Sequence, residues 1–269
     1  MTNLQNNSLP PQEIANNSFG KVHQTIKVSI EILSYGLREN FMAPLKLYLL
    51  LKFSCSGKLI ITDQVMQEIA EQLHYKSTKS VQNNLEKLYA DDWIGFNPKS
   101  GYTFIRSFER MRIKKEFYRL TSAELSFNDL QYLHEFAVAA IITSLINGQK
   151  RKIKIRAVHN QDKSGTIPPG SFFPISTHVL ANVLNCSIMQ AWRLRKEAVK
   201  LGYLKMRKPK PVPIGVHITD YQHLMKSTEN VKNFRLKKNQ VLIQDCFLLK
   251  SNLFLRSRCF INNQVRLNT

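Results

Sequence analysis

Two stretches of the chain carry the same order of hydrophobic and polar positions. Residues 63–96 and 176–206 each predict a short helix, a tight turn, a longer helix and then a hydrophobic strand. In the first stretch Val65, Ile69 and Leu73 recur at the spacing of one helix face. Each strand leads into a proline-containing turn, as expected for a β-hairpin. The pattern therefore predicts one structural unit that occurs twice.

The region around the first stretch predicts further regular elements. Thr62 and Ser77 are candidate N-caps of its two helices, because a hydroxyl at that position accepts a backbone hydrogen bond. In chain order, the other expected elements are a strand over 25–32, a buried helix over 41–53, and hairpin strands over 93–96 and 102–108.

The region around the second stretch predicts a longer preceding segment. The expected elements are a helix from Ser126 or Asn128 to Ile146 that ends at Asn147-Gly148, an edge strand over 150–156, a loop over 160–174, and strands over 203–207 and 215–219 joined by the proline-rich segment 208–213. The apolar run 241–255 fits either a helix or a strand. It must pack on the rest of the chain or on a second copy of the protein.

The two stretches can be aligned residue by residue. An offset of 111 places Ala70 on Ala181 and Leu73 on Leu184. The same offset places Val81 on Trp192 and Leu88 on Val199, and after one deletion Trp93 aligns with Tyr203 and Ile94 with Leu204. Self-similarity of this kind is typical of one supersecondary unit used twice.

Positive charge is concentrated in the second half of the chain. The formal net charge is +20. Residues 1–120 carry 16 Lys and Arg against 11 Asp and Glu, and residues 121–269 carry 23 against 8. A basic surface attracts phosphates through its long-range field and through counterion release, so nucleic acid is the expected partner.

Composition excludes several other classes. No apolar run approaches the roughly 18 to 20 residues needed to cross a bilayer, and residues 1–20 lack the pattern of a secretory signal. The four cysteines are far apart and are expected to be reduced thiols. We therefore expect a cytoplasmic protein that has no membrane partner.

The strand starts Asp92-Trp93-Ile94 and Gly202-Tyr203-Leu204, each after two helices, resemble those of the winged-helix superfamily. Two such units in a basic chain resemble the replication initiators of plasmids and phages. That resemblance implies that the C-terminal unit grips repeated DNA sites. It also implies that the N-terminal unit mediates dimerisation and secondary DNA contacts.

The expected fold class is mainly α with small β-wings (α+β), with two winged-helix domains in tandem. The expected division is a disordered N-terminus over 1–20, a first winged-helix domain over 21–108, a basic connector over 109–125, a second winged-helix domain over 126–225, and a C-terminal tail over 226–269 that packs on the body or dimerises. A homodimer would form through the N-terminal winged helix or through this tail.

The longer helix of the second domain is the candidate reading helix. Its expected core line is Ile188, Ala191, Leu194 or Arg195, Ala198 and Leu201. The opposite face offers Gln190 and Arg193, with Met189 alongside, for reading base edges, because Gln binds adenine and Arg binds guanine bidentately. The expected phosphate contacts are Ser187, Lys196, Lys200, Lys205, Arg207, Lys208 and Lys210.

The first domain predicts a weaker DNA contact. Its exposed helix face and hairpin turn offer Lys79, Gln82, Asn83 and Lys99 as secondary contacts. Glu86, Asp91 and Asp92 are expected to oppose phosphate. This copy is either a weaker reader or a protein-interaction surface.

No catalytic constellation is evident, and neither a cofactor nor a metal is expected. The seven histidines show no zinc-binding spacing, and no glycine-rich phosphate loop is present. Three hypotheses remain: a replication initiator that binds direct repeats of double-stranded DNA, a transcriptional regulator that binds an operator as a dimer, and a structural or interaction protein that binds nucleic acid without sequence preference.

Overall fold

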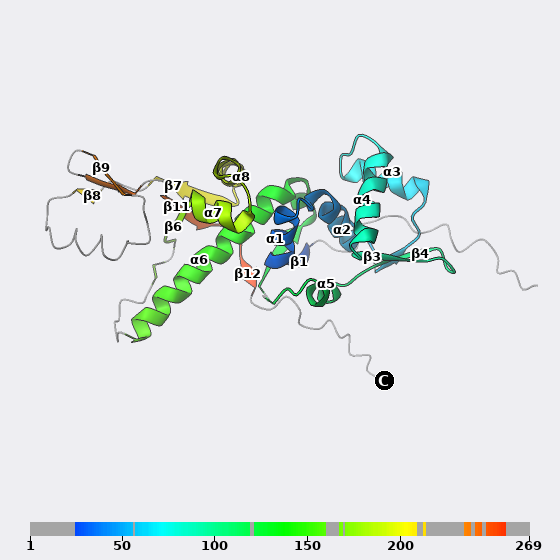
Figure 1. The fold of residues 1–269 in the computed structure, drawn as a ribbon, viewed down its shortest axis with the longest axis horizontal. Coiled ribbons are helices and arrows are strands. Elements are labelled where there is room, and N and C mark those ends of the chain that lie inside the picture. Colours follow the sequence, from blue (N-terminus) through cyan, green and yellow to red (C-terminus); the bar gives the residue numbers. More distant parts are fainter. Residues whose placement is uncertain are drawn as a thin grey trace, which may run out of the picture.

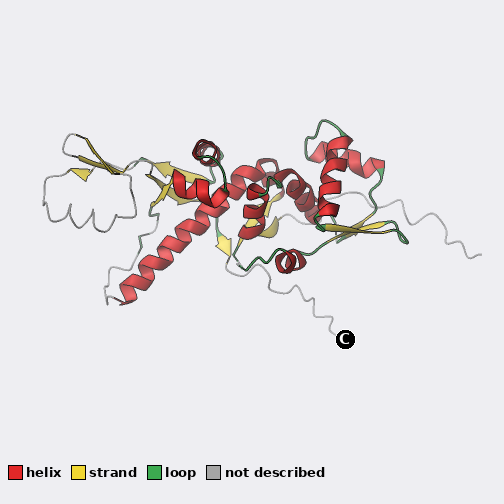
Figure 2. Ribbon diagram, viewed as in Figure 1, coloured by secondary structure: helices red, strands yellow, loops and turns green. Residues whose placement is uncertain are grey.

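The structure is a computed structural model that describes residues 25–55, 57–118, 121–159, 167–168, 170–208, 212–213, 234–237, 240–243 and 246–256. Within these residues the protein is a mixed α+β fold of helices and small antiparallel sheets (Figure 2). The predicted N-terminal segment 1–20 and the predicted strand 215–219 lie outside the described residues. No helix in the described ranges is long and apolar enough to cross a membrane.

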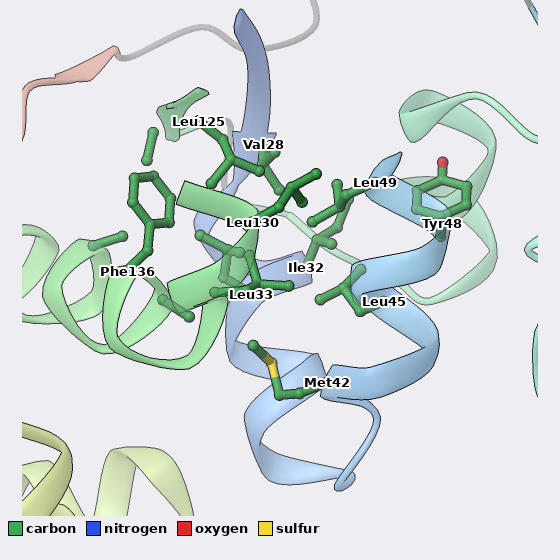
Figure 3. Close-up of a cluster of buried hydrophobic side chains, with 14 of the residues drawn as sticks. Val28, Ile32, Leu33, Met42, Leu45, Tyr48, Leu49, Leu125, Leu130 and Phe136 are labelled. Carbon is green, nitrogen blue, oxygen red and sulfur yellow. The ribbon is translucent and has the colours of Figure 1, made fainter. Parts of the chain in front are cut away.

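A three-stranded sheet joins the ends of the described chain to its middle. β1 (Thr25–Ser29) and β12 (Leu255–Arg256) pair antiparallel with β5 (Ser122–Ser126), which lies between them. α1 (Ile30–Arg38) follows β1, while the 3-10 helix η2 (Phe127–Tyr132) and α6 (Leu133–His159) follow β5. These elements meet α2 (Met42–Ser54) in a core that includes Val28, Leu33, Leu45, Leu125, Leu130 and Phe136 (Figure 3).

The first unit extends from α2 to β4 and has one small sheet. After α2 it consists of β2 (Lys58–Leu59), α3 (Asp63–Gln72), α4 (Thr78–Ala90), β3 (Ile94–Asn97) and β4 (Tyr102–Ile105). The strand order is β2-β4-β3, so the last strand lies in the middle. The predicted helices and hairpin of this unit are confirmed, and the Thr62 hydroxyl caps α3 by accepting from the Val65 N–H at 3.2 Å. α5 (Phe108–Lys114) follows.

The second unit extends from α6 to β11 and has the same topology. After α6 it consists of β6 (Phe173–Ser176), α7 (Thr177–Leu184), α8 (Ile188–Lys200), β7 (Leu204–Arg207) and β11 (Cys246–Ser251). The strand order is β6-β11-β7, so again the last strand lies in the middle. The two units therefore share the order helix, strand, helix, helix, strand, strand.

The apolar run 241–255 supplies the central strand of the second sheet. β11 pairs with β6 on one side and with β7 on the other, and Leu249 at its centre is fully buried. Between β7 and β11 in sequence, a separate sheet has the order β8-β10-β9, formed by β8 (Val212–Pro213), β9 (Phe234–Lys237) and β10 (Gln240–Ile243). It lies at the opposite end of the molecule from the first unit (Figure 1).

α6 corrects two predictions. Asn147-Gly148 does not end the helix, and residues 150–156 form no edge strand, because α6 continues to His159. Lys, Arg and Gln dominate residues 149–156 and favour a helix, whereas the alternating Ile153 and Ile155 resemble a strand only in their spacing. The helix also begins later than predicted, because residues 127–132 form the 3-10 turn η2.

α1 was not predicted, because apolar residues continue from the strand into the helix. The predicted strand over 25–32 ends at Ser29. The Ser29 Oγ accepts a hydrogen bond from the Glu31 N–H at 3.2 Å and thereby caps α1. Ile32 and Leu33 are fully buried, so the same apolar residues serve a helix rather than a strand.

Burial corrects the alignment of the two longer helices. Val81 and Leu88 are fully buried, but Trp192, the predicted equivalent of Val81, is 39% exposed. The fully buried residues at these positions of α8 are Ala191 and Ala198. The offset is therefore 110 within these helices, as it is for Trp93 and Tyr203. The deletion lies in the turn before the helix, which is one residue shorter in the second unit.

Candidate nucleic-acid interface

A short turn sets the start of α8. Asn185 ends α7 in the left-handed conformation (φ 52°), and the Cys186 N–H donates to the Ala181 carbonyl at 3.1 Å. Ser187 then caps α8, because its Oγ accepts from the Gln190 N–H at 3.1 Å. Local hydrogen bonds therefore fix the angle between α7 and α8.

The inner face of α8 carries one large polar side chain among small ones. Arg195 is 1% exposed and lies on the same helix face as Ala191 and Ala198. Its Nη1 donates to the Thr177 Oγ1 at 3.0 Å, and its guanidinium carbon lies 4.2 Å from the centre of the Phe247 ring. Arg195 thus ties α8 to α7 and to the central strand β11.

The predicted core line of α8 is correct only in part. Ala191, Arg195 and Ala198 are buried, whereas Ile188 is 47% exposed and Leu201 is 36% exposed. Both exposed residues lie at the ends of the helix.

The outer face of α8 exposes every predicted base-reading residue. Gln190, Arg193 and Met189 are exposed, as are the predicted phosphate contacts Lys196 and Lys200. Trp192 shares this surface, and the Lys196 Nζ lies 5.1 Å from the centre of its ring.

The sequence alignment missed Trp192 because it paired this residue with buried Val81. The two N-cap positions would have corrected the alignment, since Ser77 and Ser187 are 110 apart.

A single carboxylate lies on α8. Glu197 forms an ion pair with Lys200 at 3.6 Å, and the side chain of Lys200 is 77% exposed. Such surface pairs contribute little to stability because water and salt screen them. The field of this helix face is therefore set by Arg193, Lys196 and Lys200.

β7 extends the basic surface beyond α8. Lys205, Arg207 and Lys208 are exposed. The guanidinium carbon of Arg207 lies 4.3 Å from the centre of the Phe172 ring, a cation–π contact that restricts where Arg207 points. Lys210 lies outside the described residues. β7 pairs with β11, and the strand 215–219 predicted to form a hairpin with 203–207 lies outside the described residues.

The first unit exposes its predicted contacts on α4 and on the turn between β3 and β4. Lys79, Gln82 and Asn83 are exposed on α4. Lys99 is exposed on the turn, where its N–H donates to the Asn97 Oδ1 at 3.0 Å. Ser77 precedes α4, but its side chain makes no capping hydrogen bond. α4 and α8 are separated by α2, α1 and α7, which pack on one another in that order (Figure 1).

Asp91 and Asp92, which were predicted to oppose phosphate, are both paired with groups of the protein itself. Asp91 forms an ion pair with Lys115 and accepts hydrogen bonds from the Trp93 Nε1 (2.7 Å) and the Tyr35 hydroxyl (2.8 Å). Asp92 pairs with Arg106 at 3.2 Å and with Lys114 at 3.1 Å. Two lysines of the predicted basic connector, Lys114 and Lys115, therefore neutralise these carboxylates.

These pairs determine the protonation of the two carboxylates. Burial alone would raise the pKa of Asp91, but the hydrogen bonds from Lys115, Trp93 and Tyr35 outweigh it and hold this pKa below its ordinary value. The hydrogen bond from Lys114 is the largest cause that lowers the pKa of Asp92. Both groups are therefore anions at neutral pH and remain paired.

In the described ranges, no group of three or more His, Cys, Asp or Glu side chains is placed to hold a metal ion. Cys55 and Cys186 are free thiols.

No family model matches this chain, and comparisons with curated proteins and with solved structures found no match. The exposed face of α8 carries one amide, one guanidinium and two ammonium groups. Beside it, β7 carries Lys205 and Arg207, and Lys208 follows directly after this strand.

Proposed function

We propose that this chain binds double-stranded DNA with sequence preference and places α8 in the major groove. The observation that carries the proposal is the outer face of α8, where Gln190 and Arg193 are exposed beside Lys196 and Lys200. An α-helix fits the major groove, and residues near its N-terminus approach the bases most closely. Gln190 and Arg193 lie in the first two turns of the helix.

The roles of the side chains follow from their donor groups. Arg193 donates two hydrogen bonds to O6 and N7 of guanine, and Gln190 pairs with N6 and N7 of adenine. Lys196, Lys200 and the cations of β7 contact phosphates, which position the helix without reading sequence. Met189 and Trp192 add apolar contact to the groove wall.

The shared topology supports winged-helix domains for both units. In such a domain a helix, a strand, two helices and two strands follow one another, and the strands after the second helix form the wing. In the second unit, the proposed wing corresponds to the chain between β7 and β11. It is longer than the turn between β3 and β4 in the first unit.

The two units then have unequal tasks. The second unit is the main DNA contact. The first unit offers Lys79, Gln82 and Asn83 on α4, where Lys87 is the one other cation, and is an auxiliary contact or a homodimer surface. A replication initiator acting in the bacterial cytoplasm is the narrower form of this proposal, and it predicts directly repeated sites. A transcriptional regulator predicts one palindromic operator.

The test is selection of bound sequences from a random duplex pool at near-physiological salt. A defined motif is expected, and its arrangement as repeats or as a palindrome separates the two narrower forms. Arg193→Ala should weaken binding to the selected site by about tenfold to a hundredfold and relax one base position, since a bidentate contact contributes about 1–3 kcal/mol of discrimination.

Arg38→Ala is the control, because it removes an exposed arginine from α1 that is not among the proposed DNA contacts, and it should leave the motif unchanged. A pool without any motif would contradict sequence preference. A motif that Arg193→Ala leaves unaltered would show that α8 is not the reading helix.

A further inference from the structure

The second half of α6 is a basic helix that extends beyond the body of the second unit (Figure 1). Within seven residues it carries Lys150, Arg151, Lys152, Lys154 and Arg156. With a rise of about 1.5 Å per residue, the part after Ile146 spans about 20 Å. This segment was not among the predicted DNA contacts, because the sequence pattern indicated an edge strand.

Three of these cations line a hollow on the protein surface. Lys150, Arg151 and Lys154 face Ile167, Pro168 and Gly170 across a volume of about 530 Å³. A smaller neighbouring hollow of about 80 Å³ shares Lys150 and Gly170 and is also lined by Lys250 of β11. No acidic residue lines either hollow, in the part of the chain that the structure describes. The two hollows therefore bring four cations from two distant segments to one place.

The same cluster is continuous with the basic strand β7. Lys250 is the direct cross-strand partner of Lys205. Like charges at directly opposed positions of a sheet destabilise it. Among the ion pairs of the described residues, none involves Lys150, Arg151, Lys154, Lys205 or Lys250. An external anion would offset this repulsion.

Helix electrostatics alone do not account for the cluster. Cations at a helix C-terminus interact favourably with the macrodipole, but the effect is confined to the last turn. Lys150 lies nine residues before the end of α6 at His159. Lys150 and Lys154 are also four residues apart, a spacing at which like charges repel. The Lys150 Nζ lies 5.4 Å from the centre of the Phe173 ring, a contact that partly offsets this repulsion and leaves the ammonium group without a carboxylate partner among the described residues.

We propose that Lys150, Arg151, Lys154 and Lys250 form a phosphate-binding site that holds the DNA backbone outside the segment read by α8. This inference rests on the proposed function and adds a second contact to it. Lysine and arginine donate to phosphate oxygens and release condensed counterions whatever the base sequence. The site therefore lengthens the bound segment of DNA and leaves its sequence preference unchanged.

The test compares Lys150→Gln/Lys154→Gln with the control Lys27→Gln/Arg110→Gln, which removes two exposed cations from β1 and α5. Glutamine retains helix propensity, so α6 should remain helical. Binding is measured over a salt series on the selected site alone and on the same site lengthened by about 15 base pairs on each side.

On the longer duplex, the double variant should reduce the slope of log K against log salt by about 2, because each lost phosphate contact contributes about 0.9. Lys250→Gln, which leaves α6 intact, should reduce it by about 1. The control pair should change neither slope nor motif. An unchanged slope in both α6 and Lys250 variants would overturn the site.

The two proposals fail in different ways. If the random pool yields no motif but the variants still lower the salt slope on a duplex of arbitrary sequence, the phosphate site stands and sequence preference does not. If the motif persists and the slopes of all variants equal that of the unaltered protein, the reading helix stands and the phosphate site is wrong.

Discussion

The first and second units share one topology but use their equivalent positions for different chemistry. Val81 and Leu88 on α4 correspond to Ala191 and Ala198 on α8, and all four are buried. Between them, Leu85 corresponds to Arg195, which is also buried but carries a charge. The topology thus determines which positions face inward, and the neighbouring elements determine which side chains are tolerated there.

The residue that follows the second helix illustrates the same point. Trp93 and Tyr203 occupy equivalent positions at the start of the next strand. Trp93 donates to Asp91 within its own unit at 2.7 Å, whereas Tyr203 donates to Asp129 of η2 at 2.6 Å. The first unit takes this carboxylate from the residue that follows α4, whereas the second unit takes it from η2, a distant part of the chain.

The largest expected difference between the units concerns their buried faces. Arg195→Ala should destabilise the second unit by about 3 kcal/mol, because it leaves a cavity and removes the partner of Thr177. Arg195→Leu, which copies the first unit, should cost less because it fills more of the space. Urea unfolding can be followed through Trp192 in a Trp93→Phe background, since the chain has two tryptophans, one in each unit.

Leu85→Ala is the matched change in the first unit, and its effect should appear in the fluorescence of Trp93 when Trp192 is replaced by Phe. If Arg195→Ala unfolds at the same urea concentration as the unaltered protein, Arg195 does not hold α8 in place.

An intermediate effect is expected from the carboxylate network, which is specific to the first unit. The pKa of Asp91 is lowered in the folded state, so its stabilisation is complete above the ordinary value and is lost as pH falls through the folded value. The first unit should therefore lose stability in acid, below about pH 4. Asp91→Asn should cost about 1–2 kcal/mol at neutral pH and reduce this acid dependence, while Asp92, whose pKa is also lowered, retains its own part of it.

The measurement is urea unfolding at several pH values with Trp93 as the reporter. The unfolding of the second unit, followed through Trp192, provides the internal control. An equal loss of stability in acid with and without Asp91 would assign the pH dependence to other groups.

The smallest expected difference concerns the caps of the two longer helices. Ser187→Ala should destabilise the second unit by about 1 kcal/mol, because it removes the bond to the Gln190 N–H. Ser77→Ala should have an effect below about 0.3 kcal/mol, because Ser77 makes no capping bond through its side chain. Thermal or urea unfolding of the two variants measures the difference, and equal losses would show that the two caps are alike.

Much of the local structure could be predicted from the sequence. The helices of both units, the hairpin of the first unit and the cap Thr62 follow from apolar spacing and capping chemistry, which act over a few residues. Ser77 precedes α4 as predicted, but its side chain makes no capping bond. The exposed face of α8 also follows, because residues opposite a buried stripe must face outward. The end of β1 and the length of α6 do not, because apolar residues there fit either a strand or a helix.

The sequence by itself determined the repeated order of elements, the unequal charge of the two halves and the candidate residues on α8. The tertiary structure decided what the distant segments do. It places 246–251 at the centre of the second sheet, buries Arg195 against Phe247, pairs Asp91 with Lys115, and gathers Lys150 and Lys250 around one hollow. These contacts join residues far apart in the chain, so no local pattern records them, and only packing makes them neighbours.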